Sequence, residues 1–146
     1  MRGAAGFTTV ELIVVMLLMA VMAGLALPRL TERTALQERG ARDQLRSMLD
    51  HSRKLAMTQG RDVCVLATPA QARAVYTAAG ACSAAQPVTA PTGDGAYQID
   101  MPAGVTLAGA ALVRFNSRGQ LVPAVDLNLL VGVLPLTVSR ETGFAY

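Results

Sequence analysis

The first thirty residues of the chain contain one long hydrophobic stretch. Residues 12–27 form an almost unbroken apolar run, and a single acid, Glu11, stands at its start. A run of roughly 20 mostly apolar residues has the length of a helix that crosses a bilayer. The pattern therefore predicts a transmembrane helix over residues 7–30, with a carboxylate near its beginning.

A second helical pattern follows Pro28, a residue type that removes one helical hydrogen bond and usually kinks a helix. Apolar or small residues recur at helical spacing on one face: Ala41, Leu45, Met48, Leu49, Ser52, Leu55 and Ala56. The opposite face is charged, and three i,i+4 pairs are placed to interact: Glu38 with Arg42, Arg46 with Asp50, and Asp50 with Lys54. With Gly60 as the expected C-cap, residues 31–60 are predicted to continue the helix as an amphipathic half that packs on a domain.

Residues 61–146 change to short β-prone stretches separated by turn signals. The predicted strands are 62–67, 73–78, 97–101, 105–107, 112–116 and 133–140. Residues 84–95, which include Pro87 and Pro91, are predicted to form an exposed loop. Residues 122–132 fit either a strand or an apolar loop that meets a partner. The predicted fold class is α+β, with a long N-terminal helix packed on a small antiparallel sheet.

Composition adds a mild positive charge and no catalytic constellation. The net charge is +3, and the arginines that dominate it alternate with acids along the second helical pattern, so the charge is weak evidence for nucleic acid. His51 is the single histidine. The sequence contains no Gly-rich phosphate loop, no metal-binding motif and no nucleophile with a histidine base. We therefore expect no enzyme activity, no cofactor and no metal site.

Two cysteines lie in the β-prone region, Cys64 in the first predicted strand and Cys82 just after the second. An even count in an exported domain predicts one disulfide. A bridge over this short separation stabilises a fold by about 3 kcal/mol in the chain-entropy treatment. Because there is no Cys-x-x-Cys, we expect a structural bridge and not a redox site.

Residues 1–30 allow two interpretations. A cleaved secretory signal would have a basic start, an apolar core and a small-residue cleavage site, which Arg2 and Gly24-Leu25-Ala26 match loosely. Glu11 argues against it, because an acid stands where the signal should be basic or apolar. The alternative is a retained helix with Arg2 in the cytoplasm and the chain after Leu27 outside. We favour the retained helix.

The residues before the apolar run resemble a known signature. Gly6-Phe7-Thr8-Thr9-Val10-Glu11-Leu12 resembles the cleavage and methylation signature of type IV pilins and type II secretion pseudopilins. The resemblance implies a leader peptide over residues 1–6, cleavage between Gly6 and Phe7 by a prepilin peptidase, and N-methylation of Phe7. Pro28 matches the helix-kinking proline of many members, whereas Thr9 stands where leucine is commoner.

The resemblance also gives Glu11 a role in assembly, which a physical argument supports. A carboxylate buried in a bundle of helices is stable only when it has a partner. We expect Glu11 of one subunit to meet the N-terminal amine of Phe7 on a neighbour and to fix the axial register, as single buried polar groups do in coiled coils. The alternative is that Glu11 only reaches the cytoplasmic headgroups.

Two later segments narrow the resemblance. Phe115-Asn116-Ser117-Arg118-Gly119 resembles the Phe-x-x-x-Gly turn of the GspH/FimT branch of minor pilins and pseudopilins, and Val138-Ser139-Arg140-Glu141-Thr142-Gly143-Phe144 resembles its final strand. MSHA-type minor pilins share the closing run. The resemblance implies a type IV pilin-like fold in a single-pass protein of the bacterial inner membrane. Its C-terminal domain would be periplasmic before the subunit enters a filament or its tip.

The implied partners are other pilin or pseudopilin subunits, the prepilin peptidase and the inner-membrane assembly platform. Type II secretion and a type IV (MSHA-like) pilus both fit, and we lean to the GspH-like interpretation. Some FimT-like proteins bind DNA, which would assign Arg114, Arg118 and Arg140 to a DNA site here. We keep DNA binding as the less favoured alternative. The FimT-like proteins that bind DNA use a basic cluster near the C-terminus, and here no arginine follows Arg140. An ordinary membrane-anchored periplasmic domain is the third hypothesis.

Overall fold

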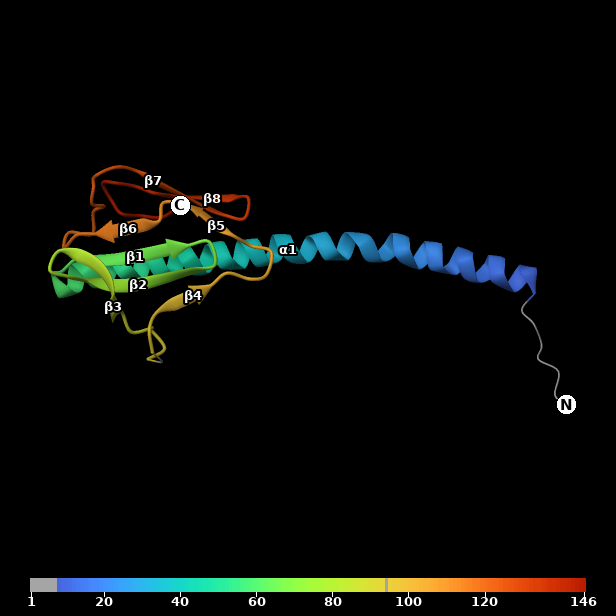
Figure 1. Cartoon of the computed structure of the whole chain (residues 1–146). Coiled ribbons are helices and arrows are strands. Elements are labelled where there is room, and N and C mark those ends of the chain that lie inside the picture. Colours follow the sequence, from blue (N-terminus) through green and yellow to red (C-terminus); the bar gives the residue numbers. More distant parts are fainter. Residues whose placement is uncertain (1–7, 94) are drawn as a thin grey trace. The chain divides into compact units, whose positions relative to one another are not determined.

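The computed structural model describes residues 8–93 and 95–146, and within these ranges it does not describe the side chains of 23–33, 84 and 85. The described chain contains one long helix followed by antiparallel strands (Figure 1). It divides into two units, Met1–Ala35 and Leu36–Tyr146, which are considered separately below. The predicted α+β fold class is confirmed.

Helix α1 (Thr9–Gln59) is the single helix of the described residues. Thr8 caps its beginning, because the hydroxyl of Thr8 accepts a hydrogen bond from the Glu11 backbone N–H at 3.3 Å. The helix ends before Gly60, whose φ of +63° is the left-handed conformation typical of a glycine C-cap. The end of α1 is therefore at the predicted place, and the helical backbone continues through Pro28.

The large apolar side chains described in the first unit are exposed. They range from 42% exposed at Val15 to 73% at Met22. Within the residues that the structure describes, no helix has both the length and the apolar character needed to cross a membrane.

The second unit contains two antiparallel sheets. The first is formed by β1 (Val63–Thr68), β2 (Gln71–Ala78), β3 (Ala81–Pro87), β4 (Gln98–Asp100) and β6 (Leu112–Phe115), in the order β3-β2-β1-β6 with β4 also beside β2. The second is formed by β5 (Leu107–Gly109), β7 (Leu127–Val131) and β8 (Leu134–Val138), in the order β5-β7-β8. The Leu121 N–H donates to the Arg140 carbonyl at 3.3 Å, and the Val122 N–H donates to the Arg114 carbonyl at 2.9 Å. These bonds connect the sheets into one curled surface.

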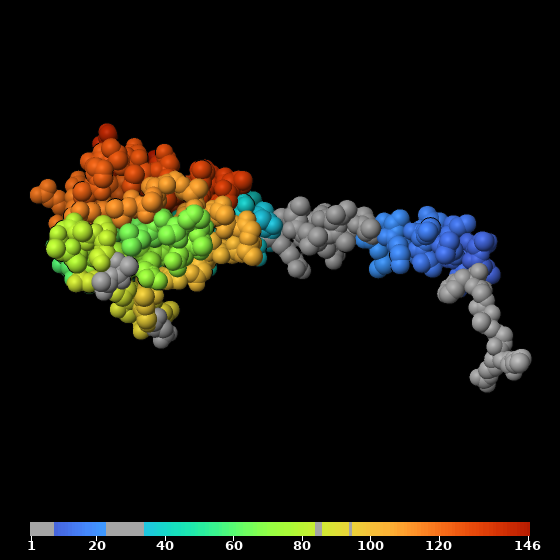
Figure 2. Space-filling view, in the orientation of Figure 1, coloured from blue at the N-terminus to red at the C-terminus, as the bar shows by residue number. Residues whose placement is uncertain are grey.

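The core of this unit lies between α1 and the strands. The predicted apolar face of the helix is buried as expected, with Leu55 half-buried and the other six residues at its centre. Alternate strand residues close over it: Val63, Val65, Ala72, Ala74, Leu129, Val131, Leu136 and Val138. In the view of Figure 2 the strands lie in front of this half of α1, of which little is visible.

Two strands differ from the sequence prediction. β3 extends to Pro87, so the predicted loop over 84–95 begins too early. Its alanines and polar residues give no β signal, and it forms because the turn at Ala79 and Gly80, both with positive φ, returns the chain along β2. The undecided region 122–132 contains β7, which forms because Leu129 and Val131 alternate into the core opposite β8.

The predicted ion pairs along α1 are also wrong. Among the described residues, none of the three i,i+4 pairs is formed. The Nε of Arg42 instead donates to the Pro135 carbonyl at 2.9 Å. A tertiary hydrogen bond to β8 replaces the local pair, because this part of the helix faces the second sheet.

Candidate assembly and binding sites

Glu11 lies in the first turn of α1, exposed among exposed apolar side chains. Its backbone N–H is bound by Thr8, and its carboxylate has no ion pair within the described residues. Gly6 and Phe7, the predicted cleavage and methylation sites, lie outside the described residues. Pro28 lies within α1, and its side chain is not described. Glu11 thus lies in the part of α1 from Val10 to Met22, whose large apolar side chains are exposed.

The predicted disulfide is present. Cys64 of β1 is bonded to Cys82 of β3, with 5.9 Å between their Cα atoms and a sequence separation of 18. Both strands pair with β2, so the bridge ties the two strands on either side of it. The register of β2 against β3 shifts between Val75 and Thr77, next to the bridge. The bond therefore fixes an irregular corner of the sheet.

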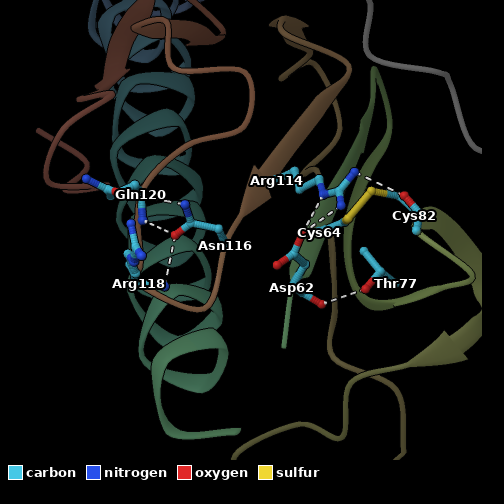
Figure 3. Close-up of polar contacts among 9 residues, drawn as sticks. Asp62, Cys64, Thr77, Cys82, Arg114, Asn116, Arg118 and Gln120 are labelled. Atoms are coloured by element: carbon cyan, nitrogen blue, oxygen red, sulfur yellow. Dashed lines mark hydrogen bonds and ion pairs between the residues drawn. A yellow bond between two sulfur atoms is a disulfide. The ribbon is translucent and has the colours of Figure 1, made fainter. Parts of the chain in front are cut away.

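An ion pair that the sequence did not reveal stands beside this bridge (Figure 3). The Arg114 guanidinium donates to the Asp62 carboxylate through Nη2 at 2.6 Å and through Nε at 2.9 Å, and to the Gly80 carbonyl through Nη1 at 3.0 Å. Thr77 donates from its hydroxyl to the Asp62 carbonyl at 3.2 Å. Arg114 thus uses its donors inside the fold, where it joins β6, the start of β1 and the β2–β3 turn.

The turn over residues 116–120 is organised by Asn116 (Figure 3). Its Oδ1 accepts hydrogen bonds from the backbone N–H of Arg118 at 2.9 Å and of Gln120 at 3.0 Å. Gly119 has a φ of +77°, which glycine adopts without strain. Phe115 anchors the turn in the core. The predicted Phe-x-x-x-Gly turn therefore exists as a turn, and it leaves Arg118 exposed.

The turn over residues 139–143 returns the chain along β8. The Gly143 N–H donates to the Ser139 carbonyl at 2.8 Å, and Thr137 and Tyr146 exchange two backbone hydrogen bonds of 2.9 Å. The last residues therefore pair with the outer edge of β8. Arg140 lies in this turn, with its backbone N–H bound by Asp126 Oδ1 at 2.7 Å and its Nη2 3.8 Å from Glu141 Oε1.

The two turns pack against each other and against α1, and we call them the clustered turns. A side chain at Gly143 would collide with the Gly119 carbonyl, and one at Gly119 would lie 2.8 Å from the sulfur of Met57. Arg53 of α1 lies against both glycines, and its guanidinium carbon is 5.1 Å from the centre of the Phe144 ring. No sequence signal identified Arg53, which the helical pattern placed on the solvent face.

An open pocket of about 610 Å³ adjoins the clustered turns. Its lining comprises Asn116, Gln120, Leu121, Val122, Ala124, Arg140 and Glu141. Of the three arginines predicted for the DNA alternative, Arg118 and Arg140 lie on the adjoining turns. Arg114 lies apart, beside the disulfide.

A long helix packed on a curled antiparallel sheet is the arrangement of type IV pilin-like proteins, and solved structures of that class align with this chain. The type IV minor pilin FimU of Pseudomonas aeruginosa PAO1 aligns in two crystal forms. One has 21% identity over 80% of this chain and 90% of FimU with a TM-score of 0.58, and the other has 19% identity over 74% and 90% with a TM-score of 0.57. The minor pseudopilin EpsH of the Vibrio cholerae type 2 secretion system has 13% identity over 75% of this chain and 94% of EpsH, with a TM-score of 0.56.

Neither a protein-family model nor a curated protein matches the sequence. At these identities the structural likeness shows the fold. The chain therefore has the type IV pilin-like fold that minor pilins and minor pseudopilins share, and the predicted resemblance is confirmed at that level.

Proposed function

We propose that this protein is a minor pilin or minor pseudopilin, a structural subunit that is held in the inner membrane and then drawn into a filament or its tip. One observation supports this most strongly. The Gly6-Phe7 and Glu11 signature stands directly before the helix of a chain whose fold is type IV pilin-like. The signature and the fold are independent, since one is local sequence and the other is the arrangement of residues 36–146.

In this proposal a prepilin peptidase removes residues 1–6 and the new amine of Phe7 is methylated. Residues 7–30 anchor the subunit in the inner membrane and later form the polymerising surface, and the domain that begins near residue 61 stands in the periplasm. The assembly platform and other pilin subunits are the partners. The role is mechanical and not catalytic.

The Glu11 carboxylate selects the register of the polymer. The neighbouring side chains Val10, Leu12 and Ile13 are 68%, 55% and 57% exposed, so they are free to contact other helices. Apolar contacts alone would tolerate several axial positions of one helix along another. A buried carboxylate without a partner costs several kcal/mol. The position that places a neighbour's Phe7 amine beside Glu11 is therefore favoured over the others.

The test compares Glu11→Ala with Glu11→Gln in cells that hold the other subunits of the machine. Leader removal is followed by mass, insertion by membrane fractionation, and assembly by recovery of the subunit in sheared filaments. We expect both variants to be processed and inserted, and to enter filaments about tenfold less than the parent. Asp43→Asn removes an exposed acid of α1 outside the clustered turns and is the matched control. Normal incorporation of Glu11→Ala would contradict the pairing.

Two assembly systems fit this subunit, a type II secretion system and a type IV (MSHA-like) pilus. Of the two, we propose the GspH-like pseudopilin role in type II secretion. The neighbouring genes test this proposal. Secretion-system genes beside this one would support type II secretion, and pilus genes would support the type IV pilus.

The DNA-binding alternative has a separate test. Arg114 gives it little support, because its guanidinium is engaged by Asp62 and Gly80, which leaves Arg118 and Arg140. Salt-dependent retardation of DNA by the protein would favour this alternative, and absence of binding at low salt would remove it.

A further inference from the structure

Arg53 has a role that polymerisation through α1 does not explain. It lies in the second half of the helix, half-buried, and its Nε is fully buried without a hydrogen-bond partner. Within the described residues it has no ion pair. A buried polar atom that lacks a partner costs about 1–3 kcal/mol. The Arg53 Nη atoms also form no hydrogen bond within the described residues, and unlike Nε they are not buried, so they are available to a ligand.

The surroundings hold the Arg53 side chain in one place. Its Cδ lies 3.1 Å from where a Gly143 Cβ would be, and its Cγ lies 3.2 Å from where a Gly119 Cβ would be. The Phe144 ring lies 5.1 Å from the guanidinium carbon, within range of a cation–π contact. A side chain that is already fixed loses little conformational entropy when it binds a ligand.

The charges around Arg53 are unbalanced. Arg118 is exposed on the adjoining turn, and its side chain has no ion pair among the described residues. Of the acids on the clustered turns and beside them, Glu141 lies 3.8 Å from Arg140, and Asp126 accepts the Arg140 backbone N–H. Arg53 and Arg118 are left without an acid on these turns, and Asp50, three residues before Arg53 on α1, forms no ion pair within the described residues. Two apolar side chains beside Arg53 are exposed, Phe144 at 48% and Met57 at 38%.

We propose that Arg53, Arg118 and Phe144 form a docking surface for an acidic segment of a partner protein, in which a carboxylate binds the Nη atoms of Arg53. A fixed, planar guanidinium matches a carboxylate with two parallel hydrogen bonds. Phe144 and Met57 offer contact area to the neighbouring side chains of the same segment. The adjoining pocket includes Gln120, whose side-chain Nε2 can donate a hydrogen bond to a polypeptide carbonyl.

The same observations favour a protein over a nucleic acid. A phosphate backbone needs a row of available cations, and Arg114 is already neutralised by Asp62. Glu141, 78% exposed in its side chain, and Asp126 stand next to the surface and repel phosphates. A single anchored carboxylate tolerates this mixed surface better than a polyanion does.

The test uses the full chain in detergent micelles, labelled with ¹⁵N, and titrated with a capped hexapeptide that carries one glutamate beside one leucine among serines and glycines. The uncharged control is the same peptide with glutamine in place of the glutamate. We expect saturable shifts of the Gly119, Gly143 and Phe144 amides with the glutamate peptide and none with the glutamine peptide. Arg53→Gln should weaken binding by about tenfold, the effect of losing a charge-assisted pair. Arg118→Gln should weaken it by less than about fivefold, because that side chain is exposed.

Arg46→Gln is the matched control, since it removes an exposed arginine from α1 outside the surface. Equal losses for Arg53→Gln and Arg46→Gln would overturn the proposal, because they would mean unspecific attraction. Tighter binding of a hexathymidylate than of the glutamate peptide at the same residues would overturn it in favour of nucleic acid. If Arg53→Gln lowers the thermal midpoint of the domain, Phe144→Ala replaces it, with an expected loss of about threefold and no loss of charge. These outcomes do not depend on Glu11, so they separate this surface from the proposed assembly role.

Discussion

The two halves of α1 belong to one helix but differ in what surrounds them. From Val10 to Met22 the large apolar side chains are exposed. From Ala41 to Ala56 one stripe of the helix is buried beneath strands of the same chain. The second half therefore obtains its partners from its own sequence, whereas the apolar side chains described in the first half are exposed.

This difference explains why the acids of the two halves have different meanings. Asp62, just after the second half, is satisfied within the fold by Arg114. Glu11, in the first half, has no ion pair within the described residues. The contrast teaches that residues of the first half should affect assembly, and residues of the second half should affect folding stability.

The largest expected effect tests this division directly. Leu49→Ala opens a cavity at the centre of the core and should lower the free energy of unfolding of the second unit by about 2–5 kcal/mol. Leu17→Ala makes the same substitution in the first half, where the side chain is 62% exposed. It should change the free energy of unfolding of the second unit by less than about 0.5 kcal/mol. Urea unfolding of the full chain in micelles measures both. Equal losses would mean that the two halves are not distinct.

The next effect concerns the disulfide. Replacing Cys64 and Cys82 together by serine should lower the free energy of unfolding by about 3 kcal/mol, because the unfolded chain is no longer constrained. The comparison of the halves predicts no change in processing of the leader or in Glu11-dependent assembly once the domain is folded. Urea unfolding with and without reductant measures the first quantity, and filament recovery at a permissive temperature measures the second. A loss of assembly in a folded double variant would show that the halves are coupled.

The sequence predicted the helix and the core because those features are periodic. The end of α1 at Gln59, its buried stripe and the Cys64–Cys82 bridge follow from spacing and composition. β3 was missed because its residues are small and polar, so its strand character comes from pairing with β2 and not from its own propensity.

The clustered turns were predictable only in part. The motifs at Gly119 and Gly143 were visible along the chain, but their contact with each other and with Arg53 depends on tertiary structure. The i,i+4 rule placed Arg42 beside Glu38, whereas packing against β8 gave it the Pro135 carbonyl. Local rules fail at these places because strands far away in the sequence cover the same helix face.

A third prediction compares two glycines of the second unit. Gly143→Ala should lower the free energy of unfolding by about 2–3 kcal/mol, because its φ is +63° and its Cβ would collide with the Gly119 carbonyl. Gly93→Ala has a φ of +84° and open space around its Cβ, so it should cost only about 1 kcal/mol. Thermal unfolding of both variants measures the difference. Equal costs would show that the clustered turns are not tightly packed.

The smallest effect concerns the ion pair beside the disulfide. Asp62→Asn should lower the free energy of unfolding by about 1 kcal/mol, a modest value because the two side chains are 24% and 27% exposed and solvent screens them. Arg118→Gln removes an arginine that has no ion pair in the described chain. It should change the free energy of unfolding by less than about 0.5 kcal/mol. Urea unfolding at low and high salt measures both, with the loss at Asp62 shrinking as salt rises. If Arg118→Gln were the more destabilising change, Arg118 would be part of the fold, and the docking surface would lose its exposed cation.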